Sequence, residues 1–417
     1  RYLPLYSVSG LWRISQEPFM ANAKWIDNLV VRASYGLQGN IDKNTSPYLL
    51  GNYRIENILP GGSEDMIDVS GAPNKKLRWE KTHSVNAGFD FAVLNQAINL
   101  SVDYYYRKGV DLIGTQMLPL ETGFEMLTVN WASMQNQGVE VALSTRNIHT
   151  KNFMWTTNFN FAYNNNKILK EALREDALEP GREGYPVGAL FALKTAGLDE
   201  EGYPMFEGKD GKAVSAMEFF KLQEWGFGAT DLTARERREL YTYVGTADCP
   251  YTGGFNNTFT YKAFELGVNF SFDFGGKVRS QPTYSIVDFD KGRNTNRDIL
   301  NRWTPENTET IFPVLLSQNE RLDEYMWYSN QNEIYRNLDI WIRDLNYVRL
   351  QNIRLGYTLP TNFSRKLGMT SATIAIEGRN LLVFGSSYKN YLDPETMSNA
   401  YATPAPKSVT LSLNLNF

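Results

Sequence analysis

Hydrophobic and polar residues alternate along most of the chain with the period of two that is typical of β-strands. In 408–417 the even positions hold only Ser, Thr and Asn, and the odd positions hold Val409, Leu411, Leu413, Leu415 and Phe417. In 264–274 one face holds Phe264, Leu266, Val268, Phe270, Phe272 and Phe274. Successive side chains of a strand point to opposite faces, so each run predicts a strand with one apolar and one polar face.

Similar alternation predicts nine more strands, which gives eleven in all. They are 1–14 (as the end of a strand), 29–38, 77–93, 98–107, 132–145, 155–164, 253–261, 343–359 and 372–384. A soluble sandwich also has alternating strands, but several of these exceed the usual length of about 5–6 residues. The polar face carries charges and amides throughout, and the apolar face is rich in aromatics. Both features favour a transmembrane antiparallel β-barrel of the outer-membrane type.

The predicted connections alternate strictly between short and long. The short ones are 15–28, a turn at 95–96, 147–153, 262–263 and 360–370, and the long ones are 40–76, 114–131, 169–252, 275–342 and 386–406. The short connections therefore lie at one end of the sheet and the long connections at the other. Outer-membrane barrels have this arrangement, with short periplasmic turns and long extracellular loops.

The long loops are predicted to contain small helices and the contact surface for a ligand or partner. Ser215 with Glu218 and Thr233 with Glu236 fit capping boxes, and Gly245 is expected to close the second helix. An aromatic cluster in 275–342 is the candidate substrate-binding site: Trp303, Tyr325, Trp327 and Tyr328. The alternative is that these rings pack the loop on itself.

Composition narrows the function further. The chain has 42 Lys and Arg against 46 Asp and Glu, a net charge of −4, which argues against a nucleic-acid partner. One Cys and two His leave little material for a disulfide scaffold, a zinc site or a histidine-based triad, and we expect no metal or cofactor. The mean hydropathy of −0.40 and the lack of a long apolar run exclude helical spans only. Aromatics make up 13% of the chain, and the alternation places many of them on the apolar face.

Six acidic residues on the polar faces could suggest paired catalytic carboxylates: Glu80, Asp90, Asp103, Glu140, Glu265 and Asp273. The pattern favours lumen-facing charges that bind water or arginine, and we do not expect an enzyme. His83, on the polar segment after Trp79, and His149, in a short turn, are expected to be structural.

Nine short motifs, in order along the chain, carry a family resemblance. They are Leu77–Thr82, Asn86–Phe91, Asp103–Tyr106, Gln137–Glu140, Gly253–Phe259 with Tyr261-Lys262, Asn301–Asn307, Tyr347–Ile353, Gly378–Leu381 and Asp393–Glu395. Together they resemble the SusC/RagA family of TonB-dependent outer-membrane transporters.

The resemblance implies a 22-stranded barrel whose lumen is filled by an N-terminal plug. Residues 1–417 would then be the C-terminal part of one barrel domain, without the plug, the upstream strands or a signal peptide. Eleven open strands expose two edges and should not fold alone. Phe417 resembles the terminal aromatic residue that the barrel-assembly machinery recognises, or it is simply the last lipid-facing residue.

The resemblance also implies a function. The protein would be a multi-pass outer-membrane importer of glycan fragments or peptides in a Gram-negative bacterium of the Bacteroidota. TonB would drive it through the plug, a SusD-like lipoprotein would form a lid, and transporter–lid pairs would dimerise. The alternative is a passive porin or structural barrel, and a soluble β-rich glycan-binding protein or enzyme is the remaining contrast.

Overall fold

A computed structural model of the chain describes residues 3–41, 48–59, 62–69, 72–124, 126–226, 229–280, 292, 297–315, 337–385, 393–396 and 402–417. These residues form two compact units. Unit 1 comprises Arg1–Ser144, Ala162–Glu175 and Gly181–Val187, and unit 2 comprises Thr145–Phe161, Asp176–Pro180 and Gly188–Phe417. Each unit is described by itself.

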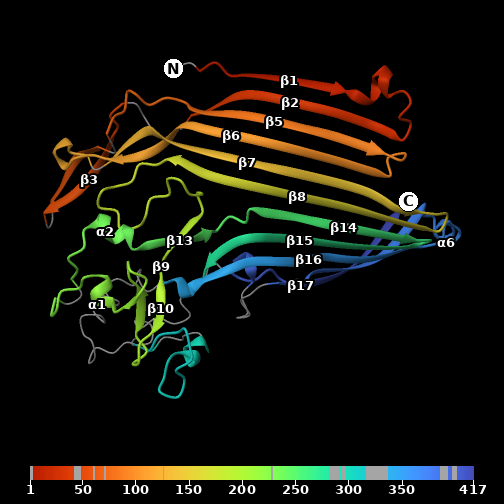
Figure 1. The fold of residues 1–417 in the computed structure, drawn as a ribbon. Coiled ribbons are helices and arrows are strands. Elements are labelled where there is room, and N and C mark those ends of the chain that lie inside the picture. The colour runs from red at the N-terminus through yellow and green to blue at the C-terminus, as the bar shows by residue number, and fades with distance from the viewer. Residues whose placement is uncertain are drawn as a thin grey trace. The chain divides into compact units, whose positions relative to one another are not determined.

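Eleven strands pair in the order β1-β2-β5-β6-β7-β8-β14-β15-β16-β17-β18, which confirms the predicted meander (Figure 1). Their bounds are β1 Tyr6–Arg13, β2 Ile26–Asn40, β5 Glu80–Val93, β6 Ile98–Met117, β7 Met126–His149, β8 Phe153–Lys170, β14 Tyr251–Tyr261, β15 Phe264–Arg279, β16 Ile342–Thr358, β17 Ser371–Phe384 and β18 Ser408–Asn416. Within the described residues β1 and β18 have a neighbour on one side only, so the sheet is not closed.

In unit 1, β1, β2, β5 and β6 pair antiparallel in sequence order. The β5–β6 connection is a tight turn in which Leu94, Asn95 and Gln96 have positive φ. The longer β2–β5 connection carries a separate hairpin, β3 (Gly51–Leu59) with β4 (Gly62–Val69). The predicted loop 40–76 therefore contains two paired strands.

In unit 2, β14 to β18 pair antiparallel, and β14 joins β15 through the two residues Lys262 and Ala263. The connections 171–250 and 280–341 contribute a module of short elements beside the strands. Its elements are β9 Ala189–Leu193, β10 Thr195–Leu198, β11 Pro204–Glu207, β12 Ala213–Val214, β13 Tyr241–Thr246, α1 Ala216–Phe219 and α2 Ala234–Glu239. Helix α6 (Thr361–Lys366) lies in the β16–β17 connection.

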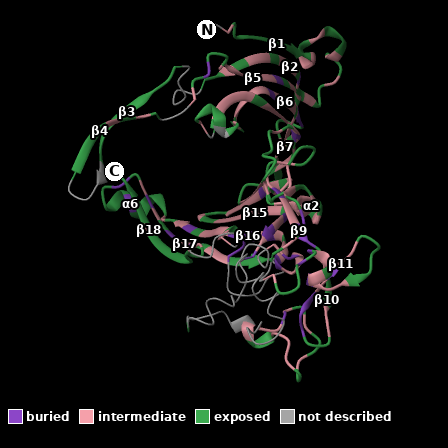
Figure 2. Ribbon diagram, turned by 90° about the vertical axis from the view of Figure 1, so that its left-hand side faces the viewer, coloured by how far each residue is buried: buried purple, intermediate pink, exposed green. Residues whose placement is uncertain are grey.

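The apolar face of the sheet is exposed or half-exposed rather than buried. In unit 2, Phe270 stacks on Phe255 with ring centroids 4.8 Å apart, and Trp155 stacks on Phe259 at 5.5 Å. The outward residues of β18 are the most exposed: Leu411 is 76% and Val409 67% exposed (Figure 2). A protein in water rarely exposes so continuous an apolar surface, so this face requires an apolar surrounding.

The hydrophobic core among the described residues lies instead in the loop module. Leu193, Phe206, Leu338 and Trp341 are each 0% exposed there, and Tyr203, Ala216, Phe220 and Leu222 pack with them. None of the described helices is long and apolar enough to span a membrane.

Several boundaries and one cap differ from the sequence predictions. β6 continues ten residues past its predicted end at Arg107, to Met117, and a positive φ at Asp111 interrupts its regular alternation. The Thr233 capping box is complete, whereas at Ser215 the side chain accepts from the Glu218 amide. The prediction for Gly245 is wrong, because α2 ends at Glu239 and Gly245 lies within β13.

His83, in the polar segment after Trp79, lies on the apolar face of the sheet. In the sheet register His83 pairs with Leu37 of β2 and with Lys108 of β6. Alternation along β5 then puts His83 on the same face as Val85 and Phe89, which is the apolar face.

The register yields a test of the face assignment on β15. Val268→Arg places a charge on the apolar face, where it should cost about 2–4 kcal/mol near the bilayer midplane. Asn269→Arg is the matched control, because Asn269 pairs with Asn256 and Asn352 on the polar face. Folding of the complete barrel into lipid vesicles, followed by its heat-modifiable gel mobility, reports the difference. Equal defects at the two positions would show that the faces are misassigned.

Candidate functional site: a loop latched to the polar face

The polar face carries ion pairs that cross neighbouring strands. In unit 1, Arg32 of β2 lies 2.6 Å from Asp103 of β6 and 3.3 Å from Asp90 of β5. In unit 2, Arg354 of β16 lies 2.9 Å from Glu265 of β15. These acidic residues therefore neutralise arginines, which agrees with the structural role predicted for them and leaves them poorly suited to acid–base catalysis.

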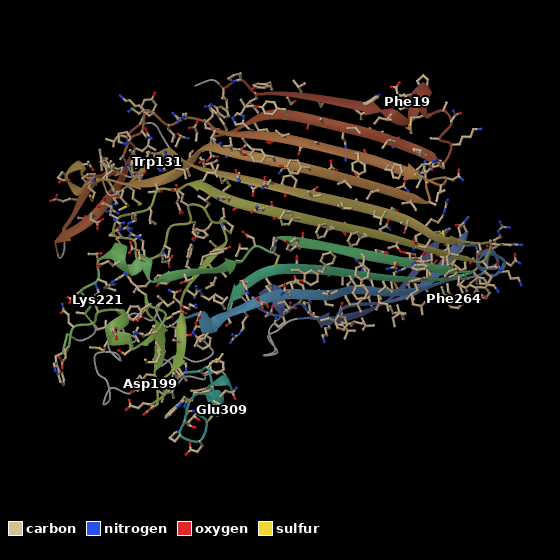
Figure 3. The ribbon with its side chains drawn as sticks, viewed as in Figure 1. Phe19, Trp131, Asp199, Lys221, Phe264 and Glu309 are labelled. Atoms are coloured by element: carbon tan, nitrogen blue, oxygen red, sulfur yellow. The ribbon has the colours of Figure 1, made fainter. Side chains whose placement is uncertain are left out.

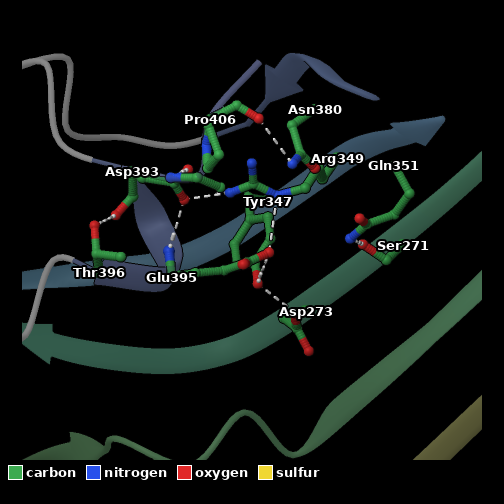
Figure 4. Close-up of polar contacts among 11 residues, drawn as sticks. Ser271, Asp273, Tyr347, Arg349, Gln351, Asn380, Asp393, Glu395, Thr396 and Pro406 are labelled. Carbon is green, nitrogen blue, oxygen red and sulfur yellow. Dashed lines mark hydrogen bonds and ion pairs between the residues drawn. The ribbon is translucent and has the colours of Figure 1, made fainter. Parts of the chain in front are cut away.

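The most buried of these clusters, in unit 2, centres on Arg349 of β16, which is 1% exposed (Figure 4). Its Nε lies 2.8 Å from Glu395 Oε1, and its guanidinium also pairs with Asp393, which is 8% exposed. Both acids belong to the β17–β18 connection, in and beside a short 3-10 turn at Pro394–Thr396. Removing one partner of a buried ion pair costs much stability, because the other charge is left buried and unpaired. We call Arg349, Asp393 and Glu395 the latch.

Neighbouring groups orient the latch on both sides. Tyr347, two residues before Arg349 on the same face, donates a hydrogen bond of 2.6 Å to Asp273 of β15. Asp393 accepts from the backbone amides of Glu395 and Ala405, at 3.1 and 3.2 Å. Asn380 of β17 donates to the carbonyl of Pro406 at 3.2 Å. The described parts of the β17–β18 connection are thus fixed against the polar face.

Both halves of the latch lie in motifs that carry the family resemblance, but the sequence alone assigns them no role. Arg349 lies in the segment Tyr347–Ile353, and Asp393, in the segment Asp393–Glu395, follows 44 positions later in the chain. Strand periodicity places Arg349 on the polar face, but it carries no information on where an irregular loop folds back. The one available signal was the pairing of an arginine in one motif with two acids in the other.

Of the predicted aromatic cluster, only Trp303 lies within the described residues; Tyr325, Trp327 and Tyr328 lie outside them. Trp303 is half-buried and packs on Gly202 in the loop module, where a Cβ would come within 2.4 Å of its ring. Gly202 also has a φ of +85°, so both the close contact with Trp303 and the backbone conformation favour glycine here. In Figure 3, Asp199 and Glu309 mark this module, and Phe264 marks the turn end of β15.

Phe264 and Phe417 are 49% and 83% exposed, and Leu413 and Leu415 are 60% and 41% exposed. Leu266, Val268, Phe270 and Phe272 are half-buried by neighbouring side chains of the same face.

Among the described residues no group of three or more His, Cys, Asp or Glu side chains could hold a metal ion. The contacts described above position connecting segments against the polar face of the sheet.

The model of the family described as "TonB dependent receptor-like, beta-barrel" matches residues 6–192. The TonB-dependent receptor P3 of Formosa agariphila is 27% identical over 97% of this chain and 41% of its own length. The TonB-dependent receptor SusC of Bacteroides thetaiotaomicron is 25% identical over 97% of this chain and 39% of its own. The solved RagAB peptide transporter superposes with a TM-score of 0.74 at 24% identity, over 99% of this chain and 43% of that one.

An antiparallel meander with an uncovered apolar face, matched in this way, defines a β-barrel of the bacterial outer membrane. The chain is similar to TonB-dependent receptors, SusC among them, and it shares the fold of RagAB. It spans about two fifths of the length of the curated relatives it matches.

The latch yields a stability test. Arg349→Met leaves the buried Asp393 carboxylate without its cationic partner and should destabilise the protein by about 3–5 kcal/mol. Arg379→Met is the control, because Arg379 pairs with Glu377 while 61% exposed and such pairs contribute about 0–1 kcal/mol. Denaturant unfolding of the refolded barrel measures both, and hydrogen exchange at the amides of Glu395 and Ala405 localises the loss. Similar losses for the two variants would contradict a buried latch.

Proposed function

We propose that the complete protein is an active importer of the outer membrane, driven by TonB, for glycan fragments or peptides. The observation that carries the proposal is the match over nearly the whole chain to proteins named as TonB-dependent receptors, SusC among them. The fold match to a peptide transporter supports transport and leaves both cargo classes in play.

The proposal assigns the two faces of the sheet to two surroundings. The face with Phe264, Leu266, Val268, Phe270, Phe272, Val409, Leu411, Leu413 and Leu415 contacts outer-membrane lipid. The polar face, with the Arg32 pairs and the latch, lines a lumen that a plug from another part of the protein occupies. The chain is thus one portion of a single barrel domain, and the edges of β1 and β18 pair with further strands of that domain.

Long connections support a role for the loop end in capture. The loop module has a core of its own, so it presents a defined surface rather than a flexible tether. We assign the docking of a SusD-like lipoprotein to this end, substrate contact to the region of Trp303, Tyr325, Trp327 and Tyr328, and recognition by the assembly machinery to Phe417. Dimerisation of transporter–lid pairs belongs to the same proposal.

Energy dependence separates active import from a passive porin. Cells expressing the complete protein should take up one class of fluorescent oligosaccharides or oligopeptides, and uptake should fall to background when tonB is deleted or the proton gradient is collapsed. A strain lacking the transporter gives the background, and a general porin substrate controls for membrane integrity. Uptake that persists without TonB would replace the proposal with a passive pore.

A further inference from the structure

On β5 and β6, the outward face of unit 1 carries a pair of basic side chains beyond its apolar residues. The outward residues of β5, from the short turn upward, are Val93, Phe91, Phe89, Ala87, Val85 and then His83; those of β6 run from Ile98 through Tyr104 and Tyr106 to Lys108. His83 and Lys108 are directly paired in the register. On β5 and β6 the apolar side chains are therefore replaced by two basic ones at one level, at which β2 and β1 place Leu37 and Tyr6.

This level coincides with the edge of the hydrocarbon layer. Ten residues separate Val93 from His83, and ten residues of a strand tilted by about 40° rise about 25 Å, the height of the apolar band of such barrels. The short β5–β6 turn is at the other end of the same strands. Given the outer-membrane orientation, His83 and Lys108 lie where the headgroups of the outer leaflet begin.

Hydroxyl groups surround the basic pair. The Tyr35 hydroxyl lies 2.9 Å from His83 Nδ1, and the two rings stack with centroids 6.3 Å apart. Tyr6 packs on Tyr35 at 6.1 Å, and Tyr106 occupies the next outward position below Lys108. Tyrosine at this depth presents an apolar ring to acyl chains and a hydroxyl to headgroups. The His83 ring is thereby held in place on the surface.

The nearby acidic group is already neutralised. Asp111 of β6 lies 2.5 Å from Arg78 and 3.1 Å from Lys81. Within the described part of the chain, Lys108 makes no ion pair, so its charge is available to an external anion. A half-buried ammonium at a membrane boundary is favourable when it meets an anionic headgroup.

We propose that His83, Lys108, Tyr35 and Tyr106 form a binding site for the phosphate of an outer-leaflet glycolipid. The acyl chains lie along the apolar side chains of β5 and β6, and the phosphate meets Lys108 and His83. Binding of this kind anchors the barrel at a fixed depth and is separate from import of cargo. It requires the membrane orientation but not the substrate or TonB, so it survives failure of the uptake test.

The test uses the complete protein in detergent with monophosphoryl lipid A as the probe, and native mass spectrometry counts bound lipid. Lys108→Ala should weaken binding about fivefold, the effect of one lysine near an anionic surface. Lys108→Arg should restore it. Lys262→Ala is the matched control, because Lys262 is an exposed lysine at the short-turn end of β14.

Competition identifies the source of the phosphate. Dephosphorylated lipid A and phosphatidylglycerol should both compete poorly, the first because it lacks the phosphate and the second because it has only two acyl chains to lie along β5 and β6. Unchanged binding by Lys108→Ala, an equal loss in Lys262→Ala, or equal competition by phosphatidylglycerol would each overturn the glycolipid site.

Discussion

The outward face of the sheet is a continuous apolar surface that no described element of the chain covers, and the rest of the structure depends on this constraint. Burying apolar area is worth about 25 cal/mol per Å², so a surface with Leu411 at 76% exposure cannot stay in water. The membrane removes it from water, and the backbone must then be hydrogen-bonded strand to strand. The meander order, the lengths of the strands and the aromatic stacking between β14 and β15 all follow from that requirement.

The polar face is subject to a different constraint, because charged side chains inside a barrel must be paired or hydrated. Arg32 with two aspartates and Arg349 with the two acids of the latch show the pairing solution in the two units. At the latch the pairing also does structural work, since it fixes an irregular connection to the wall. Loops held this firmly can present a defined surface to cargo or a lid without a hydrophobic core beneath every segment.

Strand periodicity predicted the fold because the constraint acts on every second residue, as in Phe264–Phe274. It failed where that constraint ends. β6 runs on past Lys108 to Met117 with a positive φ at Asp111. On the β3–β4 hairpin, Glu56 and Glu64 occupy one face, and Asp65 interrupts the other, which holds Tyr53, Ile55 and Ile67. A polar residue such as His83 interrupts the apolar alternation of β5 without ending the strand. The contact of Arg349 with Asp393 depends on the path of a loop, which periodicity does not encode.

The central claim is that one face of these strands contacts lipid and the other contacts water. Spin labels placed one at a time along 264–274 of the complete protein, after every native cysteine, Cys249 among them, is replaced by serine, test it most directly. In membranes, the accessibility of each label to oxygen and to a water-soluble nickel chelate should alternate with a period of two. Oxygen should dominate at Leu266, Val268 and Phe270, and the chelate at Gly267, Asn269 and Ser271. A profile without alternation would contradict the account.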